Sequence, residues 1–143
     1  MPERRDRTHY DYEEGENGDW ERFEEVAWKM GVRVEERQGE SWRRSYFATE
    51  GVIFKHKVVH VGTEEMEDEG EEGQARVVTA GLHELGHADA ETPDDYMTNP
   101  WDTIACEEEA WDKAQDISRR KRLPFDEEVR DEALESYYGW GGA

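Results

Sequence analysis

The sequence has a single cysteine, few basic residues and no long apolar run. The lone thiol of Cys106 excludes an intrachain disulfide and a zinc site built from several cysteines. The 18 basic residues are outnumbered by 38 acidic ones, which argues against binding to nucleic acid or to an anionic membrane. No apolar run approaches the roughly 20 residues that span a bilayer, and residues 1–7 lack the apolar core of a signal peptide. We therefore expect a soluble, cytoplasmic protein.

The length of 143 residues suits one domain. Hydrophobic residues make up only 34% of the chain and charged residues 39%, a balance that leans toward disorder. Six tryptophans, six tyrosines and four phenylalanines lean the other way, because each aromatic side chain can bury a large area. The charged segment 1–18 is predicted to be a loosely ordered tail, and residues 19–143 a single domain with a small aromatic core.

The spacing of apolar residues predicts an α+β domain. Apolar residues recur at helical spacing in four segments, residues 20–30, 73–90, 102–120 and 124–138. β-Branched and aromatic residues predict three or four short, mostly antiparallel strands, in residues 32–34, 46–48, 52–54 and 58–61. The segment 64–72 has seven acids in nine positions and is predicted to be a solvated loop, with a charged rim of a binding cleft as the alternative.

The sequence His83-Glu84-Leu85-Gly86-His87 matches the H-E-x-x-H pattern of zinc enzymes. Residues four apart lie one turn above each other on a helix, so both imidazoles can reach one metal ion. Glu84 is rotated about 100° from His83, which places its carboxylate beside the ion, where it can take a proton from bound water. Zinc suits imidazole ligands and keeps a position open for that water. Since about 0.03 such motifs are expected by chance in this composition, we predict a zinc site.

The third protein ligand must be a carboxylate or an upstream histidine, because no histidine follows His87. Three consecutive glutamates lie in the third predicted helix. At 100° per residue, Glu107 falls in the middle of the apolar face, Glu108 at its edge and Glu109 on the polar side. A carboxylate on an apolar face is costly unless it is paired or bound to metal. We therefore predict Glu107 as the third ligand, with Glu108 as the alternative.

This arrangement resembles the gluzincin metallopeptidases, in which a glutamate on the next helix completes the metal site. Glu107-Glu108-Glu109-Ala110 is similar to the E-x-E-A pattern of minimal gluzincins, including the ImmA/IrrE-like peptidases, where the first glutamate is the ligand. The similarity covers roughly residues 20–122 and weakens after Ala110, where such peptidases usually have Asn or Asp and this chain has Trp111. The resemblance implies a small zincin-like domain, with a short, mostly antiparallel sheet packed on the histidine helix.

The resemblance also implies a zinc metalloendopeptidase. Glu84 would activate a zinc-bound water and then hand the proton to the leaving amine. The substrate would be a peptide or protein segment, held along an edge strand that precedes the histidine helix. Val58–Val61 is the expected edge strand. Tyr96, in the loop between the two ligand helices, is a candidate to polarise the substrate carbonyl, with aromatic packing as its alternative role.

Two other functions are consistent with the same residues. A non-proteolytic protein could keep zinc for structure, and its acidic surface could mimic nucleic acid and bind a basic protein partner. A zinc hydrolase of another kind, such as an amidase, would use the same ligands. Zinc content, a Glu84 variant and a peptide-library digest discriminate among these alternatives.

Overall fold

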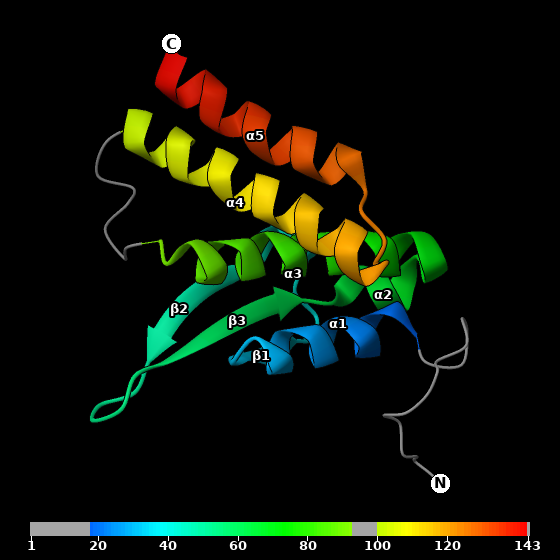
Figure 1. The fold of residues 1–143 in the computed structure, drawn as a ribbon. Helices are drawn as coiled ribbons and strands as arrows, with labels where there is room; N and C mark the ends of the chain where they lie inside the picture. Colours follow the sequence, from blue (N-terminus) through cyan, green and yellow to red (C-terminus); the bar gives the residue numbers. More distant parts are fainter. Residues whose placement is uncertain (1–17, 93–99, 143) are drawn as a thin grey trace, which may run out of the picture.

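The computed structural model describes residues 18–92 and 100–142, which form five α-helices, one 3-10 helix and a three-stranded mixed sheet (Figure 1). The α+β class is therefore confirmed. The predicted tail lies outside the described residues, apart from Gly18. In chain order the elements are α1 (Asp19–Lys29), β1 (Val32–Arg37), η1 (Trp42–Arg44), β2 (Tyr46–Glu50), β3 (His56–Gly62), α2 (Glu64–Asp68), α3 (Gly70–Ala90), α4 (Pro100–Lys121) and α5 (Glu127–Gly142).

The sheet has the strand order β1-β3-β2, so β3 lies in its centre. β2 runs antiparallel to β3, whereas β1 runs parallel to it. The sheet is thus mixed, and the expectation of mostly antiparallel strands is wrong. The connection through η1 carries the chain from one edge of the sheet to the other before β2 begins. Alternation of apolar residues indicates which side chains face the core, but it does not encode the direction of a neighbouring strand.

The predicted strand at residues 58–61 is confirmed, but its expected role as an edge strand and the predicted strand at residues 52–54 are wrong. Val58–Val61 lies in β3, which pairs with a strand on each side and so offers no free edge to a substrate. The free edges belong to β1 and β2. The apolar segment Val52-Ile53-Phe54 is not a strand but part of the loop that joins β2 to β3, and its three side chains are exposed.

The long helix α3 lies between the sheet and the pair α4 and α5 (Figure 1). The side chains of α3 are buried on nearly all sides from Val77 to Ala88, because the sheet, α1 and α4 all pack against this stretch. Within the part of the chain that the structure describes, no helix combines the length and apolarity needed to cross a membrane. The main core contains Trp20, Phe23, Val59, Val61, Val78, Leu82, Leu85, Trp111, Ala114 and Ile117.

The acidic segment 64–72 is helical, not a loop. It forms α2 and the first turn of α3, and its residue Glu65 is only 7% exposed. The Glu65 carboxylate accepts hydrogen bonds from the Ser41 hydroxyl, at 2.6 Å, and from the backbone N–H of Trp42, at 2.9 Å. A run of acidic residues usually indicates a solvated segment, because most of its side chains are exposed. In this segment, however, the buried carboxylate of Glu65 holds η1 in place.

Replacing Glu65 by Ala should lower the free energy of unfolding by about 1–3 kcal/mol, because a buried backbone N–H and a hydroxyl would lose their acceptor. Chemical denaturation measures this change. Glu67→Ala is the matched control, since Glu67 is exposed on the same helix and should change the free energy by no more than about 0.5 kcal/mol. Equal effects of the two variants would show that the Glu65 contacts do not stabilise η1.

Candidate metal centre

The two histidines of the H-E-x-x-H motif lie on one face of α3, in its last two turns. Their imidazole centroids are 4.6 Å apart, and both side chains are largely buried. The helix continues three residues beyond His87, to Ala90, and its C-cap residue Glu91 has the left-handed backbone conformation often found at helix C-termini. The regular helix therefore places both imidazoles toward α4, as the four-residue spacing requires.

Glu107 of α4 lies opposite both histidines. Its Oε1 is 2.7 Å from Nε2 of His83, and its Oε2 is 3.0 Å from Nε2 of His87. Glu107 is 0% exposed, whereas Glu108 and Glu109 are exposed. The helical pattern predicted this difference. In the interior of the protein, the carboxylate of Glu107 thus contacts the Nε2 atom of each imidazole, with one oxygen for each ring.

Glu84 lies on the other side of His83. Its Oε2 is 3.0 Å from Nδ1 of that ring, and it is only slightly exposed. The ligand atoms of His83, Glu84 and His87 all lie within 4.8 Å of one another, so this His/Glu/His group could hold a metal ion. Two carboxylates therefore flank the histidine pair, and they differ in which ring nitrogens they contact.

The two carboxylates give the site a strong negative potential. Burial lowers the pKa of His83, but the neighbouring Glu84 and Glu107 outweigh burial and raise this pKa to about 10. Burial raises the pKa of Glu107, but hydrogen bonds from His83 and His87 hold it well below its usual range. The site therefore favours positive charge at the point where the three side chains meet, whether the charge is a proton or a metal ion.

Two further residues orient the histidines, and the sequence did not single them out for this role. Thr92 Oγ1 lies 3.0 Å from Nδ1 of His87, which suits a ring whose Nε2 faces a metal. The indole of Trp111 stacks on His83, with ring centroids 4.2 Å apart and planes 4° apart. The available signal in the sequence is the spacing of Trp111, four residues after Glu107, which places both on one face of α4.

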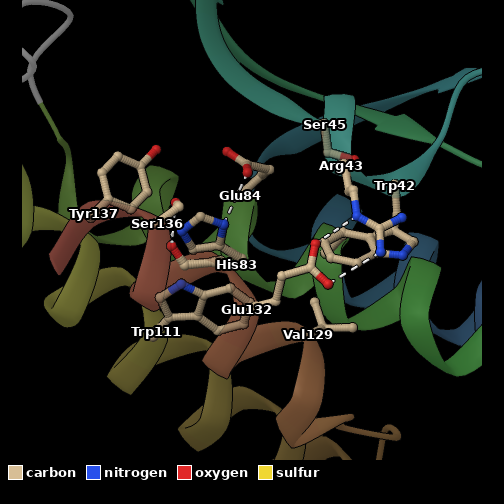
Figure 2. A pocket seen from close by; sticks show the side chains of 12 residues that line it. Trp42, Arg43, Ser45, His83, Glu84, Trp111, Val129, Glu132, Ser136 and Tyr137 are labelled. Atoms are coloured by element: carbon tan, nitrogen blue, oxygen red, sulfur yellow. Dashed lines mark hydrogen bonds and ion pairs between the residues drawn. The ribbon is translucent and has the colours of Figure 1, made fainter. Parts of the chain in front are cut away.

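A pocket of about 250 Å³ opens beside His83 and Glu84. Figure 2 shows these two residues with Ser136 and Tyr137 at one end of the pocket and the Arg43–Glu132 pair at the other. The pocket walls come from η1, α3, α4 and α5, so segments far apart in the sequence build it. Its lining residues are Trp42, Arg43, Ser45, Ala80, His83, Glu84, Trp111, Val129, Glu132, Ala133, Ser136 and Tyr137.

Two other ionisable side chains near these segments lie outside the site. His60 is buried in β3, where its Nε2 lies 2.6 Å from Glu50 and its ring stacks on Tyr46. Asp89, close after the motif, pairs with Lys113 at 3.4 Å. Tyr96 lies outside the described residues. Comparisons with protein-family models, with curated proteins and with solved structures give no match.

Proposed function

We propose that this protein is a zinc-dependent metallopeptidase with a zincin-like fold of the gluzincin type. The observation that carries the proposal is the position of Glu107, whose buried carboxylate contacts Nε2 of both His83 and His87. This is the donor set of two imidazoles and one carboxylate that catalytic zinc takes in proteins. We propose a cytoplasmic location, because a free thiol such as that of Cys106 suits a reducing compartment.

The distances in the site fit a zinc ion. Two ligand atoms that each lie about 2.0–2.1 Å from a tetrahedral zinc are roughly 3.3 Å apart. The carboxylate oxygens of Glu107 lie 2.7 and 3.0 Å from the two Nε2 atoms, so these separations would widen by roughly 0.6 and 0.3 Å to admit the ion. We assign His83, His87 and Glu107 as the ligands. Glu84 contacts only one of the two rings, at Nδ1, which leaves it available for proton transfer.

A bound zinc ion would polarise the substrate carbonyl and make water a stronger nucleophile. Glu84 lines the pocket together with His83, one of the three proposed ligands, and acts as the general base and acid. It accepts a proton as the water oxygen bonds to the carbonyl carbon, and it donates that proton to the amide nitrogen as the C–N bond breaks. Trp111 holds the plane of His83, and Thr92 holds that of His87.

The substrate that suits this site is an extended peptide segment. β2 is an edge strand, and Ser45, the residue before it, lines the pocket together with Glu84. A peptide that adds to the free edge of β2 by backbone hydrogen bonds would enter the pocket near Ser45. We therefore propose β2, rather than Val58–Val61, as the edge strand that pairs with the substrate.

Metal analysis tests the proposal. Purified protein loaded with zinc and then dialysed should contain one zinc per chain by elemental mass spectrometry, and His83→Ala should lose it. Circular dichroism checks that the variant is folded. His60→Ala is the matched control, because His60 is also a buried histidine but lies in β3. Absence of zinc in the folded wild-type protein, or equal zinc in both variants, would refute the assigned site.

A further inference from the structure

The loop between β2 and β3 exposes three consecutive large apolar side chains. Val52, Ile53 and Phe54 are 97%, 82% and 79% exposed. Among the residues with described side chains, the other exposed large apolar residues are Trp28, at 76%, and Tyr46, at 44%. A chain with so few hydrophobic residues leaves three adjacent ones in water, and contiguous exposed apolar surface marks an interaction site. We call Val52–Phe54 the hairpin tip.

The backbone geometry holds the hairpin tip in a tight loop. Gly51 has φ of +124°, and a Cβ at this position would lie 2.0 Å from the carbonyl oxygen of Phe54. Glycine is therefore required for the chain to fold back here. The pairing of Glu50 with His56 then closes the hairpin. Such a loop presents its apolar side chains outward at little further cost in conformational entropy on binding.

The hairpin tip and the pocket lie at opposite ends of the same free edge. Ser45 lines the pocket, β2 follows it, and the tip begins at Val52. In Figure 1, β2 runs toward the loop that joins it to β3. At about 3.3 Å per residue, the five steps from Ser45 to Glu50, where β2 ends, span roughly 17 Å, and the tip begins two residues further on. A polypeptide that is paired with β2 and enters the pocket would thus pass the tip about seven residues from the point of cleavage.

The size and charge of the hairpin tip favour a polypeptide substrate over other partners. A stable complex of two folded proteins buries about 800 Å² on each side, whereas one aromatic side chain covers roughly 150–250 Å²; the tip therefore suits one anchor in a longer contact. The sequence from Gly51 to Lys57 has two lysines and no acid, but a net charge of −20 on the whole chain opposes an anionic membrane.

We propose that the hairpin tip is an exosite, a secondary site that binds an apolar segment of a protein substrate while the adjoining chain follows β2 into the pocket. This inference rests on the proposed peptidase function and deepens it. It predicts that the protein prefers substrates with an apolar segment about seven residues from the scissile bond. Such substrates are longer than the short peptides that fill the pocket alone.

The test uses three quenched fluorescent peptides, one short and two long, and the zinc-loaded protein. The short peptide is an eight-residue sequence selected for cleavage from a library. The long versions carry four more residues at one terminus or the other, of which the outer three are Leu-Phe-Val, so that this apolar segment lies six to eight residues from a scissile bond at the centre of the short sequence. One long version should have a KM about tenfold lower than the short peptide, because an aromatic anchor is a frequent hot spot of binding. The kcat should be the same.

Replacing all three tip residues by serine, V52S/I53S/F54S, should raise the KM of the long peptide to that of the short one. Trp28→Ser is the matched control, because Trp28 is an equally exposed aromatic residue on α1, next to the opposite edge strand β1. In protein that also carries Glu84→Gln, fluorescence anisotropy measures binding without cleavage. The Kd of the long peptide should there be about tenfold higher with V52S/I53S/F54S than with the unaltered tip.

Each other result overturns the exosite. Equal KM and Kd values of the long peptide for wild-type protein and the tip variant would do so while leaving the peptidase intact. Loss of self-association in V52S/I53S/F54S, by analytical ultracentrifugation, would show instead a contact between two copies. Loss of co-sedimentation with phosphatidylserine vesicles would show a membrane contact. If no library peptide is cleaved by the zinc-loaded protein, the peptidase function and the exosite fail together.

Discussion

Replacing Glu84 by Gln should lower the kcat of peptide hydrolysis by about 10³-fold, while the protein still holds one zinc per chain. General acid–base catalysis by a positioned carboxylate contributes about 10²–10⁴ in rate, and an amide cannot carry the proton. The substitution preserves shape, and its oxygen can still accept a hydrogen bond from Nδ1 of His83, where Glu84 now lies 3.0 Å away. Steady-state kinetics and elemental analysis of the same sample measure both quantities.

Glu108→Gln is the matched control for this prediction. Glu108 is an exposed glutamate on α4, next to the proposed ligand Glu107, so its substitution makes the same change in charge near the site. It should leave kcat within about twofold. If Glu84→Gln retains full turnover, Glu84 is not the base. If it loses zinc, the carboxylate of Glu84 is a ligand and the assignment of the two glutamates must be exchanged.

The arrangement of His83, His87 and Glu107 in the candidate metal centre was predictable because its parts are local. The spacing of His83 and His87 within one helix sets their common face, and the spacing of Glu107 within the next helix sets its burial. Both depend only on the period of an α-helix. The helix-to-helix contact that joins them was implied by chemistry, since a buried carboxylate needs a partner.

The surroundings of the centre were not predictable by the same means. The sequence indicated β3 as an edge strand, but β3 is central and β2 lies at the edge. This order depends on a connection that crosses the sheet, and such a connection leaves no periodic signal in the sequence. Glu65 was misplaced because its burial depends on Ser41 and Trp42, more than 20 residues away. The contribution of Val129 and Ser136 to the pocket likewise depends on how α5 returns over α4, a long-range contact.

The substitution Gly86→Ala should both destabilise the protein and weaken its hold on zinc. A Cβ at Gly86 would lie 2.2 Å from the backbone oxygen of Ala110, three residues after Glu107. Because that atom belongs to a helix backbone, α4 must move away, and overpacking of this kind costs about 3 kcal/mol. Alanine regains about 1 kcal/mol of helix propensity, which leaves a net loss of about 2 kcal/mol, measurable by chemical denaturation.

Displacement of α4 would also draw Glu107 away from His83 and His87. The affinity for zinc, measured by competition with a chelator, should then fall by about 10–100-fold, as when a residue that orients a ligand is lost. Gly81→Ala separates this effect from instability. On the same helix, a Cβ at Gly81 would lie 2.6 Å from the end of the Phe23 ring, which strains the core but spares the contact between α3 and α4. We expect Gly81→Ala to lower stability and to leave the affinity for zinc unchanged. If Gly86→Ala gave the same result, the close approach of α3 and α4 would not be what holds the proposed metal ligands together.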